Sequence, residues 1–205
     1  LVQAFWHKDQ DDTAPFGVEM VYSDDQGSTW NQGLSVDVSG TPEASDLNET
    51  SMAQARNGDL VAIIRTDGGN TLSGRYHYLV RTPDGETISE QRGEPSAQSS
   101  ETRTWLLQAN NWPAIDGVEN KPKLMFLSIQ ERGDTPDLGR ADMRIFLSYD
   151  NGENFDIQKR IKRRDAGYCA IETMPEHRFI IAYEDSGRKF INLRSISLSD
   201  IYSIQ

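Results

Sequence analysis

Short runs of hydrophobic residues recur along the chain, and Gly, Asn, Asp or Pro residues separate them. Within several runs apolar and polar residues alternate, as they do in half-buried antiparallel strands. Long amphipathic helical patterns are hard to find. The pattern therefore predicts an all-β protein. The predicted strands lie in GVEMVYS (17–23), DLVAIIRT (59–66), RYHYLVRT (75–82), PKLMFLSIQ (122–130), MRIFLSYD (143–150), RFIIAYED (178–185) and FINLRSISL (190–198).

One turn sequence recurs between these strands. The segment YSDDQGSTW (22–30) has the pattern S-x-D-x-G-x-T-W, and SYDNGENF (148–155) repeats its Ser, Asp, Gly and aromatic positions. A less complete copy, RTPDGETI (81–88), keeps the Gly and Thr and has Ile in the aromatic position. The copies start at residues 23, 81 and 148, so they are 58 and 67 residues apart. A coincidental Asp-Gly hairpin turn is the alternative interpretation.

The turn has a physical logic. Its Asp can accept hydrogen bonds from turn amides, its Gly supplies a positive φ, and its aromatic residue can fill space between adjacent sheets. A spacing of about 60 residues fits one four-stranded unit per repeat. The sequence therefore predicts a β-propeller of four-stranded antiparallel blades.

Charge and composition narrow the function. The 205 residues carry a net charge of -11 with a pI near 4.7, which argues against nucleic acid or an anionic membrane surface as partner. A protein with this net charge can still bind an anionic small molecule if a few arginine side chains converge at the binding site. The single cysteine, Cys169, excludes an internal disulfide and is expected to be a buried apolar residue. No apolar run is long enough to span a membrane.

The repeated turn is the motif called the Asp box, and the order of motifs around it resembles the sialidase (neuraminidase) superfamily. The resemblance runs through LNETSMAQARNGDLVAIIRTDGG (47–69), LGRADMRIFLSYDNGENF (138–155) and DAGYCAIETMPEHRFIIAYED (165–185). It implies Tyr168 as nucleophile, Glu49 as its catalytic base, and Arg65 and Arg140 as two members of an arginine triad that binds the substrate carboxylate. Glu184 is then the acid that supports the triad's first arginine.

This residue set suits sialic acid, whose carboxylate lies on the anomeric carbon. Guanidinium groups bind a carboxylate through charge-assisted hydrogen bonds. An anionic nucleophile would be repelled by the same carboxylate, whereas a neutral phenol avoids the repulsion. The resemblance thus implies a retaining exo-α-sialidase that releases terminal sialic acid from glycoconjugates, without a metal or other cofactor, in a secreted, periplasmic or (in a eukaryote) lysosomal location.

The chain departs from the family in its extent. The family's first arginine and its aspartate acid/base lie upstream of anything that matches here. A sialidase propeller has six blades, and 205 residues suffice for only three to four. Residues 1–205 therefore resemble the C-terminal part of a single propeller domain, with its N-terminal half as partner, and we expect the part alone to be inactive.

Each assignment has a simpler alternative. Tyr168 could be an ordinary core residue, Glu49 could accept turn amides, and Arg65 and Glu184 could be solvated strand ends. For Arg140, both Arg132 and Arg144 are neighbouring candidates. The basic segment KRIKRRD (159–165) is predicted to be a solvated loop. Two other functions stay open: a non-catalytic propeller that binds a glycan or protein, and a hydrolase of another acidic sugar.

Overall fold

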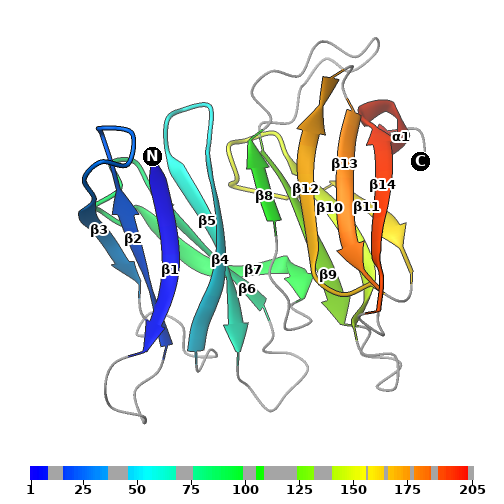
Figure 1. Ribbon diagram of the computed structural model, residues 1–205, viewed down its shortest axis with the longest axis horizontal. Helices are drawn as coiled ribbons and strands as arrows, with labels where there is room; N and C mark the ends of the chain where they lie inside the picture. Colours follow the sequence, from blue (N-terminus) through cyan, green and yellow to red (C-terminus); the bar gives the residue numbers. More distant parts are fainter. Residues whose placement is uncertain are drawn as a thin grey trace.

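The computed structural model of the chain describes residues 1–8, 16–36, 46–67, 76–98, 105–108, 124–131, 140–155, 157–163, 166–175, 178–185 and 189–202. These ranges form fourteen strands and one short helix (Figure 1). The strands are β1 (Val2–Lys8), β2 (Phe16–Tyr22), β3 (Asn31–Val36), β4 (Asp46–Gln54), β5 (Leu60–Asp67), β6 (Tyr76–Thr82), β7 (Glu90–Gln98), β8 (Trp105–Gln108), β9 (Leu124–Glu131), β10 (Arg140–Ser148), β11 (Ile157–Lys162), β12 (Cys169–Met174), β13 (Arg178–Glu184) and β14 (Ile191–Ser197). The helix is α1 (Leu198–Tyr202).

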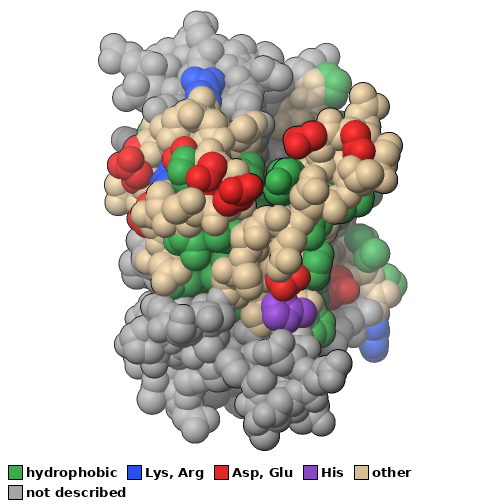
Figure 2. All heavy atoms as spheres, turned by 90° about the vertical axis from the view of Figure 1, so that its left-hand side faces the viewer, with side chains coloured by type: hydrophobic (Ala, Val, Ile, Leu, Met, Phe, Trp, Pro, Cys, Tyr) green, Lys and Arg blue, Asp and Glu red, His purple; other side chains and the backbone are tan. Residues whose placement is uncertain are grey.

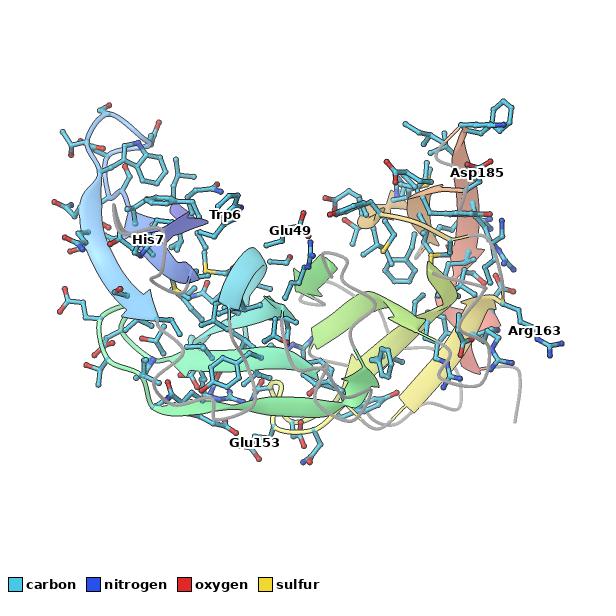
Figure 3. The ribbon with its side chains drawn as sticks, turned by 90° about the horizontal axis from the view of Figure 1, so that it is seen from below. Trp6, His7, Glu49, Glu153, Arg163 and Asp185 are labelled. Atoms are coloured by element: carbon cyan, nitrogen blue, oxygen red, sulfur yellow. The ribbon has the colours of Figure 1, made fainter. Side chains whose placement is uncertain are left out.

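The strands build four antiparallel sheets that follow one another in chain order. Within the described ranges these are β1-β2-β3, β4-β5-β6-β7, β8-β9-β10-β11 and β12-β13-β14. Within each sheet, every strand pairs with the strand that follows it in the sequence. Figure 3 shows the sheets following an open arc. The predicted all-β architecture of antiparallel propeller blades is confirmed.

The hydrophobic core lies between neighbouring sheets. Strand β5 shows why, since its residues alternate between two clusters: Ala62 and Ile64 pack with the β1-β2-β3 sheet, whereas Val61 and Ile63 pack toward Phe146 of β10. Both faces of β5 are buried, which explains its uninterrupted apolar sequence. A third cluster joins the last two sheets and α1. These clusters hold the sheets at fixed positions relative to one another.

The three repeated turns share one hydrogen-bond pattern. In the first, Ser23 Oγ donates to Asp25 Oδ1 at 2.8 Å and accepts from the Gly27 amide at 2.7 Å, while the Thr29 amide donates to Asp25 Oδ1 at 2.8 Å. Glycine is needed at position 27, where φ is 91°.

The third turn reproduces these bonds with other residues. Ser148 Oγ donates to Asp150 Oδ1 at 2.8 Å and accepts from the Gly152 amide at 2.7 Å, and the Asn154 amide donates to Asp150 Oδ1 at 2.9 Å. The middle copy begins at Thr82 rather than at residue 81, because the Thr82 hydroxyl binds both Asp84 and the Gly85 amide. It is therefore one residue shorter.

The aromatic position of the repeat behaves differently in the first and third turns. Phe155 is 2% exposed and packs against the β4-β5-β6-β7 sheet, as predicted. Ile88, in the middle copy, packs against the cluster shared with the β1-β2-β3 sheet. Trp30 is 47% exposed, so within the described residues it does not fill space between two sheets, and the prediction is wrong for this residue. In the two later copies the side chain packs on the preceding sheet, and no described sheet precedes β1.

Two further expectations concern buried groups and membranes. Cys169 is a buried member of the cluster that joins the last two sheets, and burial raises the pKa of its thiol to about 12. It is the small core residue that the sequence predicts. Among the described residues no helix is long and apolar enough to cross a membrane.

Candidate active site

Three of the five predicted site residues meet on the concave side of the arc, where Figure 3 labels Glu49. The phenol of Tyr168 donates a hydrogen bond to Glu49 Oε1 at 2.9 Å. Arg65 Nη1 donates to Glu49 Oε2 at 3.0 Å and to the Tyr168 phenol oxygen at 3.4 Å. A base, a cation and a phenol thus form one hydrogen-bonded set, drawn from the second and fourth sheets.

A β-bulge places Glu49 in this set. Leu47 pairs with Thr66 and Thr50 pairs with Ile64, so two residues of β4 face the single residue Arg65 of β5. A bulge of this kind bends the strand and changes the direction of the side chains beside it. Glu49 and Arg65 therefore lie side by side at one end of the sheet and form a direct ion pair.

Tyr168 comes from the other end of the arc. It immediately precedes β12, whose registered pairing begins with Cys169 opposite Tyr183. The Tyr168 carbonyl accepts from the Glu184 amide at 2.9 Å, and the Tyr168 amide donates to Glu184 Oε2 at 3.3 Å. Glu184 thus contacts the main chain of Tyr168, while the phenol reaches the second sheet.

Burial strengthens the interactions within the set. The Arg65 side chain is 15% exposed and that of Glu49 is 26% exposed. Partial burial lowers the effective dielectric and so strengthens charge-assisted hydrogen bonds. Glu49 can accept the phenol proton, and Arg65 can bind an anionic group brought next to the phenol. Among the described residues no group of three or more His, Cys, Asp and Glu side chains is arranged to hold a metal ion.

Arg140 is the first residue of β10, where its backbone pairs with Glu131. Its side chain lies outside the described part of the structure, as does all of Arg132. Arg144, the other neighbouring candidate, donates from Nη2 to Asp142 Oδ2 at 2.7 Å. Arg144 is therefore occupied within its own sheet.

Asp142 is the centre of a second charged cluster that the sequence did not indicate. It is 4% exposed, has a φ of 63°, and lies at a bulge two residues after Arg140. Burial acts to raise its pKa, but hydrogen bonds from Arg144 and Arg160 outweigh this effect and lower the pKa. Positive φ outside glycine is tolerated best by Asn and Asp, which suits this position.

The basic segment 159–165 corrects one prediction. Residues 159–162 belong to strand β11 rather than to a loop, and residues 164 and 165 lie outside the described ranges. Arg160 is bound to Asp142, and the Lys162 ammonium lies 4.8 Å from the centre of the Tyr183 ring. Two of the charges that the sequence assigned to a solvated loop therefore have partners within the protein.

The sequence analysis did not predict the bulge at Glu49 or the hydrogen bond between Glu184 and the Tyr168 amide, which orient the site residues. Nothing in the sequence around Asn48 and Glu49 indicates a bulge. A signal did exist for the contact between Glu184 and Tyr168, because a glycine directly precedes the tyrosine.

Comparisons with known proteins identify the fold. No protein-family profile and no curated protein matches the sequence. Solved structures do match: the NanB sialidase of Streptococcus pneumoniae has a TM-score of 0.68 at 18% identity, over 97% of this chain and 29% of that one. The intramolecular trans-sialidase of Ruminococcus gnavus has a TM-score of 0.64 at 16% identity, over 94% of this chain and 40% of that one. Trypanosoma rangeli sialidase in complex with sialic acid has a TM-score of 0.60 at 15% identity, over 92% and 28%.

The chain thus has the fold of the sialidase β-propellers. It spans 28–40% of the length of these three structural neighbours. At such low identity the likeness shows the architecture alone. The activity has to be argued from the chemistry of the site.

Proposed function

We propose that this chain is the C-terminal part of a six-bladed propeller that acts as a retaining exo-α-sialidase on terminal sialic acids of glycoconjugates. The observation that carries the proposal is the hydrogen-bonded set of Tyr168, Glu49 and Arg65. A phenol held at 2.9 Å from a carboxylate is an activated nucleophile, since the carboxylate can take its proton during attack.

The reaction has two displacements. In the first, the phenol oxygen of Tyr168 forms a bond to the anomeric carbon as the glycosidic C–O bond breaks, and Glu49 takes the phenol proton. The leaving oxygen is protonated by an acid that the family resemblance places upstream of residue 1. In the second, water replaces Tyr168 at the anomeric carbon, its proton leaves to the upstream carboxylate, and Glu49 returns the phenol proton.

Arginine recognition accounts for the choice of sugar. Arg65 already contacts the phenol oxygen, so a carboxylate bonded to its guanidinium would lie beside the nucleophile. Arg140 supplies a second guanidinium in the proposal. Sialic acid, which one structural neighbour holds, has its carboxylate on the reacting carbon.

The proposed partner is the N-terminal half of the same propeller. The first strands carry large exposed hydrophobic side chains, and Figure 2 shows hydrophobic groups gathered on this side of the molecule. The last sheet carries another exposed group of such side chains, at Phe190, Ile191 and Leu193. Extensive apolar surface of this kind is typical of an interface. The missing blades would cover both ends of the arc.

The activity implies a protein that meets glycoconjugates in a secreted or periplasmic location, or in a lysosome if the source is eukaryotic. The substrate class can be tested by titrating the full-length protein with sialyllactose and with lactose. Binding that requires the sialic acid supports the proposal, and equal binding of both favours a non-catalytic glycan-binding propeller.

The activity is tested on the full-length protein with a fluorogenic sialoside, alongside Tyr168→Phe. The Phe variant keeps the ring and loses the attacking oxygen, so its turnover should fall to near background. Cys169→Ser, next in sequence and buried in the core, is the matched control for disturbance near the site. Turnover by Tyr168→Phe at the rate of the unmodified protein would overturn the assignment of the nucleophile.

A further inference from the structure

The main chain that carries Tyr168 is tied to one residue, Glu184, at three points. The Gly167 amide donates to the Glu184 carbonyl at 2.8 Å, and the Glu184 amide donates to the Tyr168 carbonyl at 2.9 Å. The Glu184 carboxylate then turns back, and its Oε2 accepts from the Tyr168 amide at 3.3 Å. The second bond continues the pairing of β12 with β13, in which the Tyr168 amide would donate to the Glu184 carbonyl. The Gly167 amide donates to that carbonyl instead, and the Tyr168 amide donates to the Glu184 side chain.

The space for this third bond exists because residue 167 is glycine. A Cβ at position 167 would lie 2.9 Å from Glu184 Oε2 and 3.0 Å from Glu184 Cβ. Gly167 is not among the residues with positive φ, so its backbone conformation is open to alanine. An alanine at position 167 would therefore displace the Glu184 carboxylate from the place in which it accepts the Tyr168 amide.

Small shifts of this main chain matter at the phenol. Tyr168 lies just outside the registered pairs of β12, and its side chain crosses from the fourth sheet to the second. The contacts at its far end, 2.9 Å to Glu49 and 3.4 Å from Arg65, depend on the direction in which the residue leaves the main chain.

We propose that Glu184 is a positioning residue for Tyr168: its carboxylate holds the Tyr168 amide, in space that Gly167 leaves open, and thereby directs the phenol to Glu49 and Arg65. The catalytic consequence rests on the proposed sialidase function, and the positioning itself does not. This role differs from support of an upstream arginine. A glutamine at 184 keeps an oxygen that accepts the amide, but it lacks the charge that would support a guanidinium.

A double-mutant cycle tests the positioning without any activity assay. Urea unfolding midpoints of the full-length protein are measured for Tyr168→Phe alone and combined with Glu184→Gln or Glu184→Ala. Removing the phenol should lower the midpoint equally in the unmodified and Glu184→Gln backgrounds. In the Glu184→Ala background the loss should be at most half as large, because the phenol is no longer held at its partners. Equal losses in all three backgrounds would overturn the proposal.

Activity provides the second measurement. Glu184→Ala and Gly167→Ala should lower kcat by about 100-fold, as misplacement of a reacting group by about 1 Å can do. Glu184→Gln should stay close to the unmodified kcat, and Glu172→Ala, an exposed residue on the same sheet, is the control. A Glu184→Gln variant as impaired as Glu184→Ala would overturn positioning in favour of a charge role. An inactive full-length protein that still shows the coupling would overturn the sialidase function and support the positioning.

Discussion

Tyr168 and Glu49 are 119 positions apart in the sequence, yet the phenol of one donates to the carboxylate of the other at 2.9 Å. The contact joins the fourth sheet to the second across the concave side of the arc. Neither residue belongs to the hydrophobic clusters between the sheets. Their contact therefore depends on how the second and fourth sheets are placed relative to each other. In the proposed reaction, the phenol proton passes to Glu49 through this hydrogen bond.

Glu49→Gln tests the base. The amide keeps an oxygen for Arg65 but cannot take the phenol proton, so kcat should fall by about 10²–10⁴, the usual worth of general-base assistance. Fluorogenic sialoside turnover by the full-length protein is the measurement, with Glu172→Gln as the control. Loss of less than tenfold would show that the phenol is activated by another group.

Arg65→Lys tests carboxylate recognition. Lysine keeps the charge but loses the planar pair of donors, and a charge-assisted hydrogen bond is worth about 1.5–3 kcal/mol, or roughly 10–100-fold in kcat/KM. Arg178→Lys, on the exposed part of β13, should leave the kinetics unchanged. The penalty should shrink for a substrate whose carboxylate is converted to an amide. An identical penalty for both substrates would contradict the proposed contact.

The repeated turns predict a pH dependence of stability. Hydrogen bonds from Thr29 and Ser23 lower the pKa of Asp25 from 3.8 to about 2, and amides of Thr87 and Glu86 do the same for Asp84. A carboxyl group with a lowered folded-state pKa stabilises the fold above its unfolded value, and this stabilisation is lost as the pH falls from about 4 to 2. Asp25→Asn should therefore flatten the fall in the urea midpoint over this range. The neighbouring exposed Asp24→Asn should not, and equal pH profiles for both variants would contradict the account.

Contacts within a turn could be predicted from the sequence, whereas contacts between strands could not. The turn sequence gave the hydrogen bonds around Asp25 and Asp150, because local side chain to backbone bonds depend on spacing alone. The contacts of Glu49, Arg65 and Tyr168 were predicted through resemblance and not through spacing. The bulge at Glu49 and the charged cluster around Asp142 were not predicted, because both depend on which strands pair and in what register.

Trp30 and Phe155 test the proposed N-terminal half of the propeller. They occupy the same position of the repeat, but Phe155 is buried and Trp30 is 47% exposed in this chain. Phe155→Ala should cost about 3–5 kcal/mol in the free energy of unfolding, as for other buried aromatics. In the full-length protein Trp30→Ala should cost a similar amount, because a preceding sheet would bury the indole. A loss within about 0.5 kcal/mol, typical of a surface residue, would mean that nothing covers this side.

Covalent trapping tests directly whether Tyr168 is the nucleophile. A sialosyl fluoride with a second fluorine beside the anomeric carbon slows release of the glycosyl-enzyme intermediate, because fluorine destabilises the oxocarbenium-like transition state. The full-length protein is treated with this reagent, digested with trypsin and analysed by mass spectrometry. If Tyr168 is the nucleophile, one sialosyl group is added to the peptide DAGYCAIETMPEHR (165–178), located at Tyr168 and absent from Tyr168→Phe. A catalytically active protein that carries the label on another residue, or turns over the sialoside with no label on this peptide, would contradict this assignment.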